Sequence, residues 1–252
     1  MSAPLSETYF RKGFGLRSEV QEDLAADYAG HVVDLLRERD FTLSAGDMVV
    51  RLAREFGFCY GVERAVEYAY QTRRKFPHRR VVLAGEIIHN PHVNDRLREM
   101  GITILTPIAS QGSEVRFDYS QVLQDDVVIL PAFGVTIRDF EALRAIGCVV
   151  VDTTCGSVLN VWKRVDSYAK DGFTALIHGK HYHEETRATA SQVQRFDGGQ
   201  YLVVRDMDEA RLVCDYIRLL GVNDEEKPSA ELRAAFQAKF ARATGSGFDP
   251  DR

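Results

Sequence analysis

Short runs of β-branched and other apolar residues alternate with helical segments along most of this 252-residue chain, and this alternation limits the folds open to it. The strand-like runs cover residues 80–84, 102–105, 127–130 and 149–151, and the helical segments between them cover residues 62–76, 91–100 and 137–145. Strands that are joined by helices pair in parallel, and the helices cover both faces of the sheet. The sequence therefore predicts an α/β fold with a parallel sheet.

The same alternation restarts after residue 155, which indicates a second α/β unit. Residues 1–47 are predicted to be an N-terminal arm with one amphipathic helix over residues 19–39. The first α/β unit is predicted over residues 48–154, beginning with a strand at 48–53, and the second over residues 155–222. Residues 223–252 are predicted to be a helical linker or tail, with a helix at 230–243.

The composition excludes several classes of protein. A formal net charge of -5 gives no basic surface for nucleic acid, so no nucleic-acid partner is expected. The longest apolar runs have only the length of strands, and the first residues lack the pattern of a secretory or transit segment. Four cysteines without the dense spacing of a disulfide scaffold indicate a reducing compartment, so we expect a cytoplasmic protein without a membrane span.

Cys59 lies between Gly57 and Gly61, just before the helical segment at residues 62–76. The two glycines allow a tight bend around the thiol, and the first amide groups and positive dipole end of the helix favour a thiolate. Most free cysteines are instead small buried hydrophobic residues, and that alternative stays open for Cys59.

Cys155 has the equivalent position, after the strand at 149–151 and before the next helix. Because open α/β sheets bind ligands at the carboxyl ends of their strands, Cys59 and Cys155 could face each other across a cleft as metal or cluster ligands. The spacing is a weak signal, since two distant cysteines are often unrelated. Cys148 and Cys214 have apolar neighbours, which predicts that both are packed inside the protein.

Two stretches that contain histidine also follow predicted strands. His89 lies beyond a strand and at a helix start, a position that suits a diphosphate ligand and equally suits a capping loop. Residues 178–186 contain three histidines, a lysine and two glutamates. This group could bind phosphate, hold a metal ion or donate a proton, or it could belong to a solvated loop.

Five motifs occur in order along the chain: GFCYGVERA at 57–65, EIIHNP at 86–91, PAFG at 131–134, DTTC at 152–155 and HGKHYHEET at 178–186. Together they resemble the 4-hydroxy-3-methylbut-2-enyl diphosphate reductases, the IspH or LytB family of the non-mevalonate isoprenoid pathway. The resemblance extends from about residue 9 to residue 252. The N-terminal arm resembles the longer plant and cyanobacterial branch of the family.

The resemblance implies an iron-sulfur reductase with three successive small α/β units around a central cleft. Such an enzyme converts its allylic diphosphate substrate to isopentenyl and dimethylallyl diphosphate by reductive dehydroxylation. By motif, Cys59 and Cys155 match two ligands of a [4Fe-4S] cluster, and His89 and His183 match diphosphate-binding histidines. Glu185 matches the proton-donating glutamate. A ferredoxin-like or flavodoxin-like protein is the implied electron donor.

The sequence also departs from the family pattern. Phe133 stands where the shorter bacterial branch has a substrate-contacting histidine, so no role is transferred to it, and Gly156 replaces a proline that often follows the second cysteine. Two of the three family units are matched, and the unit with the third cysteine ligand is expected beyond residue 252. The alternative function is a non-catalytic, truncated α/β remnant that binds a diphosphate ligand.

The motifs and their positions after predicted strands lead to two expectations. Cys59 and Cys155 are expected to face a common cleft with His89, His183 and Glu185. Residues 1–252 alone are expected to hold no stable cluster and to be inactive, because the motifs supply only two of the three cysteine ligands.

Overall fold

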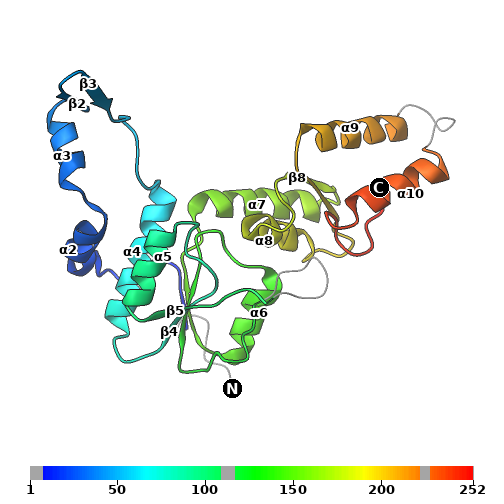
Figure 1. The fold of residues 1–252 in the computed structure, drawn as a ribbon. Helices are drawn as coiled ribbons and strands as arrows, with labels where there is room; N and C mark the ends of the chain where they lie inside the picture. Colours follow the sequence, from blue (N-terminus) through cyan, green and yellow to red (C-terminus); the bar gives the residue numbers. More distant parts are fainter. Residues whose placement is uncertain (1–7, 109–116, 222–227, 252) are drawn as a thin grey trace.

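The computed structural model describes residues 8–108, 117–221 and 228–251. Its main sheet has five parallel strands in the order β1-β7-β6-β4-β5 (Figure 1). They are β1 (Tyr9–Phe10), β4 (Val81–Leu83), β5 (Ile102–Ile104), β6 (Val127–Leu130) and β7 (Val149–Asp152). The predicted α/β class with a parallel sheet is confirmed.

Apolar side chains cover both faces of this sheet. Val127 and Ile129 of β6 belong to one core, and Val128 and Leu130 belong to a second core on the other face. The first face is covered by α2 (Arg17–Tyr28), α4 (Tyr60–Lys75) and α5 (Pro91–Glu99), and the second by α6 (Ile137–Ile146). A continuous apolar run is typical of a strand that is buried on both sides, which is why the sequence predicts β6 at its observed bounds.

The N-terminal segment takes part in the main sheet, which the description of residues 1–47 as an arm did not anticipate. Tyr9 and Phe10 pair with β7, and the Tyr9 hydroxyl donates to Asp152 Oδ2 at 2.5 Å. The single helix predicted over residues 19–39 is wrong, because the chain forms α2 and α3 (His31–Glu38) instead. Ala29 and Gly30 are extended between the two helices, and the low helix propensity of glycine explains the interruption.

An antiparallel hairpin stands where the first parallel unit was predicted to begin. β2 (Thr42–Ala45) pairs with β3 (Met48–Arg51), and Gly46 in the two-residue turn has a φ of 60°. A positive φ at glycine is typical of such tight turns. The strand predicted at 48–53 therefore belongs to this hairpin and not to the main sheet, and Figure 1 shows α3 and the hairpin projecting away from that sheet.

The second α/β unit is built on two parallel strands, β8 (Ala175–His178) and β9 (Tyr201–Val204). Two helices, α7 (Gly156–Lys170) and α8 (Glu184–Val193), pack against each other and against β8, and α8 also contacts α6. α8 was not predicted. The remaining helices are α9 (Met207–Gly221) and α10 (Ala230–Phe240). Within the described ranges, no helix combines the length and the apolar character that crossing a bilayer requires.

Asp27 ties α2 to the helices that cover the sheet. Its Oδ2 accepts hydrogen bonds from the Tyr70 hydroxyl at 2.6 Å and from Arg96 Nε at 2.8 Å. Burial alone would raise the pKa of Asp27, but the hydrogen bonds from Tyr70 and Arg96 outweigh it and lower that pKa below its ordinary value of 3.8. The stabilisation by the ionised Asp27 carboxylate is therefore complete at a pH above its ordinary pKa of 3.8. It is lost as the pH falls through the lowered pKa that Asp27 has in the folded state.

We predict that Asp27→Asn lowers the urea midpoint of unfolding at pH 7, because the charged acceptor of both hydrogen bonds is lost. The difference from the unchanged protein should shrink as the pH falls below about 4. Asp23→Asn is the matched control, because Asp23 lies on the same helix and is exposed. A deficit in Asp27→Asn that stays constant down to low pH would contradict the ionic origin of this stabilisation.

Candidate functional site

Cys59 and Cys155 occupy the same local position, at the N-cap of a helix. Cys59 precedes α4 and Cys155 precedes α7, and both have an extended backbone. The Cys155 thiol accepts a hydrogen bond from the backbone N–H of Val158 at 3.4 Å. Cys59 is exposed and Cys155 is half-buried. Each thiol therefore lies where free backbone N–H groups and the helix dipole favour negative charge.

Gly61, in the first turn of α4, lies directly against Cys155. A Cβ atom at position 61 would lie 2.7 Å from Cys155 Cβ and 3.4 Å from its Sγ. Two carbon atoms do not pack at 2.7 Å, so a glycine is needed for this close approach. The N-terminal ends of α4 and α7 are therefore in contact, and the two cysteine-bearing loops lie together.

The loop after β6 joins the Cys155 segment to the His89 segment. The backbone N–H of Cys155 donates to the carbonyl of Ala132 at 3.0 Å, and the N–H of Ala132 donates to the carbonyl of Ile87 at 3.1 Å. The next residue, Phe133, stacks its ring on His89 with 4.5 Å between ring centres and 26° between planes. Main-chain hydrogen bonds thus hold both candidate ligand segments to one loop.

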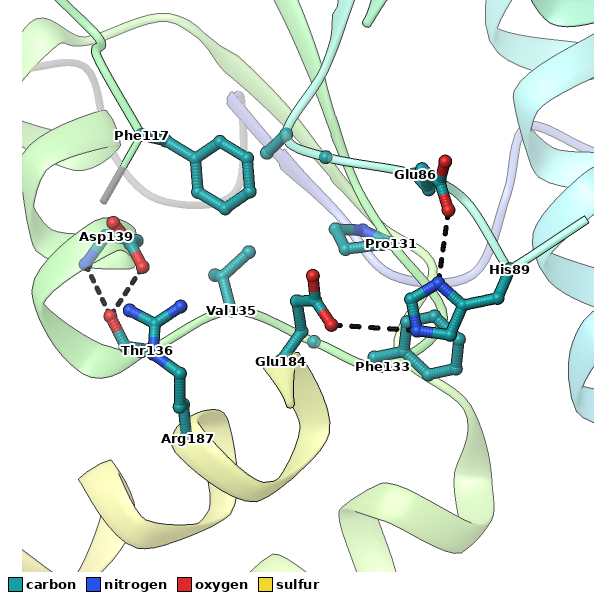
Figure 2. Close-up of a pocket in the computed structure, with 13 residues that line it drawn as sticks. Glu86, His89, Phe117, Pro131, Phe133, Val135, Thr136, Asp139, Glu184 and Arg187 are labelled. Atoms are coloured by element: carbon teal, nitrogen blue, oxygen red, sulfur yellow. Dashed lines mark hydrogen bonds and ion pairs between the residues drawn. The ribbon is translucent and has the colours of Figure 1, made fainter. Parts of the chain in front are cut away.

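His89 and His183 are in direct contact although they are 94 residues apart in the chain. Their Nε2 atoms are 3.1 Å apart, and His89 Nδ1 lies 3.1 Å from Glu86 Oε2. His183 is the N-cap of α8, where its Nδ1 accepts from the backbone N–H of Glu185 at 3.3 Å. Glu184 Oε2 lies 3.6 Å from His89 Nε2. Figure 2 shows Glu86 and Glu184 at different nitrogens of the His89 ring.

The hydrogen bond at the α8 N-terminus fixes the direction of the others. A backbone N–H can only donate, so Nδ1 of a neutral His183 is an acceptor and the ring proton is on Nε2. That Nε2–H donates to Nε2 of His89, whose own proton is then on Nδ1 and donates to Glu86. Each of these contacts pairs one donor with one acceptor.

The same group of side chains also has the composition of a cation site. His89, His183 and Glu184 each place one possible ligand atom within 4.8 Å of the others. A metal ion binds the lone pair of a ring nitrogen, but Nε2 of His183 carries a proton in the arrangement above. The hydrogen bonding therefore favours a ligand that accepts hydrogen bonds over a cation.

A pocket opens beside His89, between the loop after β4, the loop after β6 and α8 (Figure 2). Its lining includes Glu86, Phe133, Glu184 and Arg187. Among the described residues that line it, neither of the two predicted cluster cysteines is found. Neither thiol therefore borders this one cavity.

Sequence reasoning named Glu185 and missed its neighbour. Both glutamates lie in the first turn of α8, and the Glu185 side chain is half-buried. The carboxylate of Glu184, and not that of Glu185, approaches His89 at Nε2, and Glu86 contacts the other ring nitrogen, Nδ1. The signal available in the sequence was spacing, since Glu86 lies three residues before His89 and Glu184 directly follows His183. The proton-donor role of Glu185 stays a prediction.

The other two cysteines differ in burial. Cys148 is 2% exposed, and burial raises the pKa of its thiol to about 11, which makes it an inert core residue as predicted. The prediction that Cys214 is packed is wrong, because it is exposed on α9. Tyr216 marks the face of α9 that packs, whereas Leu212 and Ile217, the apolar neighbours behind that prediction, are themselves exposed.

Known proteins resemble this chain over most of its length. Residues 50–237 match the family described as LytB protein. The chain is 49% identical over 247 residues to the 4-hydroxy-3-methylbut-2-enyl diphosphate reductase of Gloeobacter violaceus and 47% identical over 247 residues to that of Thermosynechococcus vestitus. These alignments cover 98% of this chain and 55% and 56% of the two relatives, respectively. The chain thus spans about half the length of the curated relatives it matches.

Two solved structures are similar to the main part of the chain. One is described as the structure of (E)-4-hydroxy-3-methyl-but-2-enyl diphosphate reductase, the terminal enzyme of the non-mevalonate pathway. It matches with a TM-score of 0.52 and 26% sequence identity, and the alignment covers 75% of this chain and 62% of the chain in that structure. The other is a Plasmodium falciparum reductase, which matches with a TM-score of 0.52 and 20% sequence identity over 75% of this chain and 56% of that chain. At this identity it supports the fold alone. With a family match over most of its length and relatives at nearly half identity, the chain belongs to the LytB protein family.

Proposed function

We propose that this chain forms the cluster-binding and diphosphate-binding part of a 4-hydroxy-3-methylbut-2-enyl diphosphate reductase. The observation that carries the proposal is the loop after β6, which is hydrogen-bonded to Cys155 and stacked on His89. A relative that carries this name is 49% identical. The reaction is the reductive dehydroxylation of the allylic diphosphate to isopentenyl and dimethylallyl diphosphate, in the non-mevalonate route to isoprenoids.

The thiols of this chain fit part of a [4Fe-4S] site. Thiolates are the usual ligands of such clusters, and Cys59 and Cys155 lie on helix N-termini that are in contact through Gly61. Both cysteines would hold the cluster, which when bound would supply electrons and a Lewis-acidic iron. Cys148 and Cys214 lie outside these two loops, so the described residues offer two thiolates there.

His89 and His183 would bind the diphosphate. His183 is the N-cap of α8, and His89 directly precedes Asn90, the N-cap of α5, so a diphosphate between them meets two helix N-termini. Nε2 of His183 carries a proton that can be donated to a phosphate oxygen. Phe133 fixes the plane of the His89 ring by stacking, and Arg187 adds positive charge to the adjoining pocket.

Glu185 would donate the proton that lets the hydroxyl leave as water. It lies two residues from His183 at the same helix end, so a substrate that His183 holds by its diphosphate stays near this carboxyl group. General acid catalysis depends on such positioning. A ferredoxin-like or flavodoxin-like electron donor and a cytoplasmic location complete the proposal.

We predict that Cys59→Ala and Cys155→Ala abolish cluster binding, because each removes a thiolate ligand. The measurement uses a chimera of residues 1–252 with the remaining C-terminal part of the Gloeobacter violaceus relative, reconstituted anaerobically with iron and sulfide. Cys148→Ala and Cys214→Ala are the controls and should keep the visible absorbance of the cluster and the dithionite-driven turnover. Loss of the cluster in Cys214→Ala would contradict this ligand assignment.

We predict that residues 1–252 produced alone hold no stable [4Fe-4S] cluster and show no turnover, because two thiolates leave irons open to water and oxygen. Iron counting, electron paramagnetic resonance and the dithionite-driven assay compare this polypeptide with the chimera. Near-stoichiometric cluster in residues 1–252 would refute the prediction. If neither protein turns over but both bind a diphosphate, the non-catalytic binding function is the correct one.

We predict that Gly61→Ala destabilises the fold by about 1–3 kcal/mol, because the added methyl group overlaps Cys155 Cβ. Gly156→Ala is the matched control, since nothing lies within 4 Å of a Cβ at that position, and it should change stability by less than about 1 kcal/mol. Urea unfolding of residues 1–252 without iron measures both. Equal stability of the two variants would show that the cysteine loops are not packed as described.

A further inference from the structure

Glu86 lies in the candidate site without a task in the proposed mechanism. Its Oε2 is 3.1 Å from Nδ1 of His89, and this contact is drawn in Figure 2. The two residues are three positions apart in the loop between β4 and α5. The Ile87 N–H inside that loop donates to Asn94 Oδ1 at 3.2 Å, and Asn94 is 1% exposed. The loop that carries Glu86 is therefore anchored on a buried side chain of α5.

His89 is held on three sides, so its two ring nitrogens have different neighbours. Phe133 covers one face of the ring, Glu86 contacts Nδ1, and Nε2 faces His183 at 3.1 Å and Glu184 at 3.6 Å. A carboxylate accepts hydrogen bonds and cannot donate them when ionised. Glu86 therefore keeps a ring proton on Nδ1, and the neutral ring presents a lone pair at Nε2.

A phosphate oxygen needs a donor at that same Nε2 atom. In the ligand-free arrangement the His183 Nε2–H is used by His89, and His89 Nε2 has no proton to give. For both histidines to donate to a phosphate, the His183 N–H must turn to the ligand and one proton must be added to His89 Nε2. The solvent would supply this proton, and His89 would become an imidazolium with one N–H directed to the ligand and the other to Glu86.

We propose, resting on the diphosphate site of the proposed function, that Glu86 is a positioning residue that orients His89 and stabilises its imidazolium, so that diphosphate binding takes up one proton at His89. The structure assigns this to Glu86 rather than to Glu184 by the ring nitrogen that each contacts. Glu184 lies at Nε2, where the ligand oxygen must bind, so it competes with the ligand. The charged and titratable groups around the ring are these two glutamates, His183 and, in the adjoining pocket, Arg187.

The first test measures the ring protons in the ligand-free chain of residues 1–252. Nitrogen-15 NMR of the histidine rings should show His89 protonated at Nδ1 and His183 at Nε2. Glu86→Gln should keep this pattern, because the amide oxygen still accepts from Nδ1, whereas Glu86→Ala should populate the other His89 tautomer. A His89 proton on Nε2 in the unchanged protein would overturn the proposal.

The second test measures binding of inorganic pyrophosphate by calorimetry at pH 7.5 in buffers of different ionisation enthalpy. Glu86→Gln should take up about one proton fewer per pyrophosphate than the unchanged chain and bind about 10-fold more weakly, because the imidazolium loses its carboxylate. Glu184→Gln is the matched control, since it removes the same charge at the other nitrogen. It should keep the proton uptake and bind at least as tightly.

The possible outcomes separate the inference from the function on which it rests. Equal affinity and proton uptake in Glu86→Gln and the unchanged chain would overturn the positioning role even if pyrophosphate binds. If the unchanged chain binds no pyrophosphate, the diphosphate site of the proposed function is contradicted, and the tautomer measurement still decides whether Glu86 orients His89.

Discussion

The contact between Gly61 and Cys155 is the constraint on which the candidate site depends. α4 covers the main sheet and α7 begins the second unit, so this contact sets how closely the two units approach at the thiols. The space available is smaller than one methyl group, and a larger residue at position 61 would push Cys155 away. Because the Cys155 N–H is bonded to Ala132, such a shift would also disturb the loop that carries Phe133.

Sheet topology explains why residues distant in sequence meet at this place. β7, β6 and β4 are neighbours in the sheet and run in parallel, so the loops at their carboxyl ends lie along one edge. Those loops carry Cys155, Phe133 and His89, respectively. His183 reaches the same edge from the second unit, because α8 packs on both α6 and α7. The site is therefore a consequence of strand order together with the packing of one helix.

The parts of the fold that were predictable are those where burial dictates residue type over several consecutive positions. β6 has its predicted bounds because an apolar run on a doubly covered strand leaves little choice of residue. Polar, short-range features were missed: α8 starts within a histidine-rich stretch, and the β2–β3 hairpin is exposed along β3. Glu86 lies three residues before His89, so spacing could have suggested that contact, whereas the contact of Glu184 with His89 joins distant segments and depends on tertiary geometry.

The close approach of the two histidine nitrogens has an electrostatic consequence. If His89 carried a proton on Nε2 without a ligand, its N–H would face the N–H of His183 across 3.1 Å, and two donors repel, whereas a donor that faces a lone pair attracts. An anion placed between the rings would remove this repulsion, because it accepts from both N–H groups and separates the two nitrogens. In the proposed diphosphate site, proton uptake and anion binding are therefore linked, and the affinity for diphosphate is expected to fall as the pH rises.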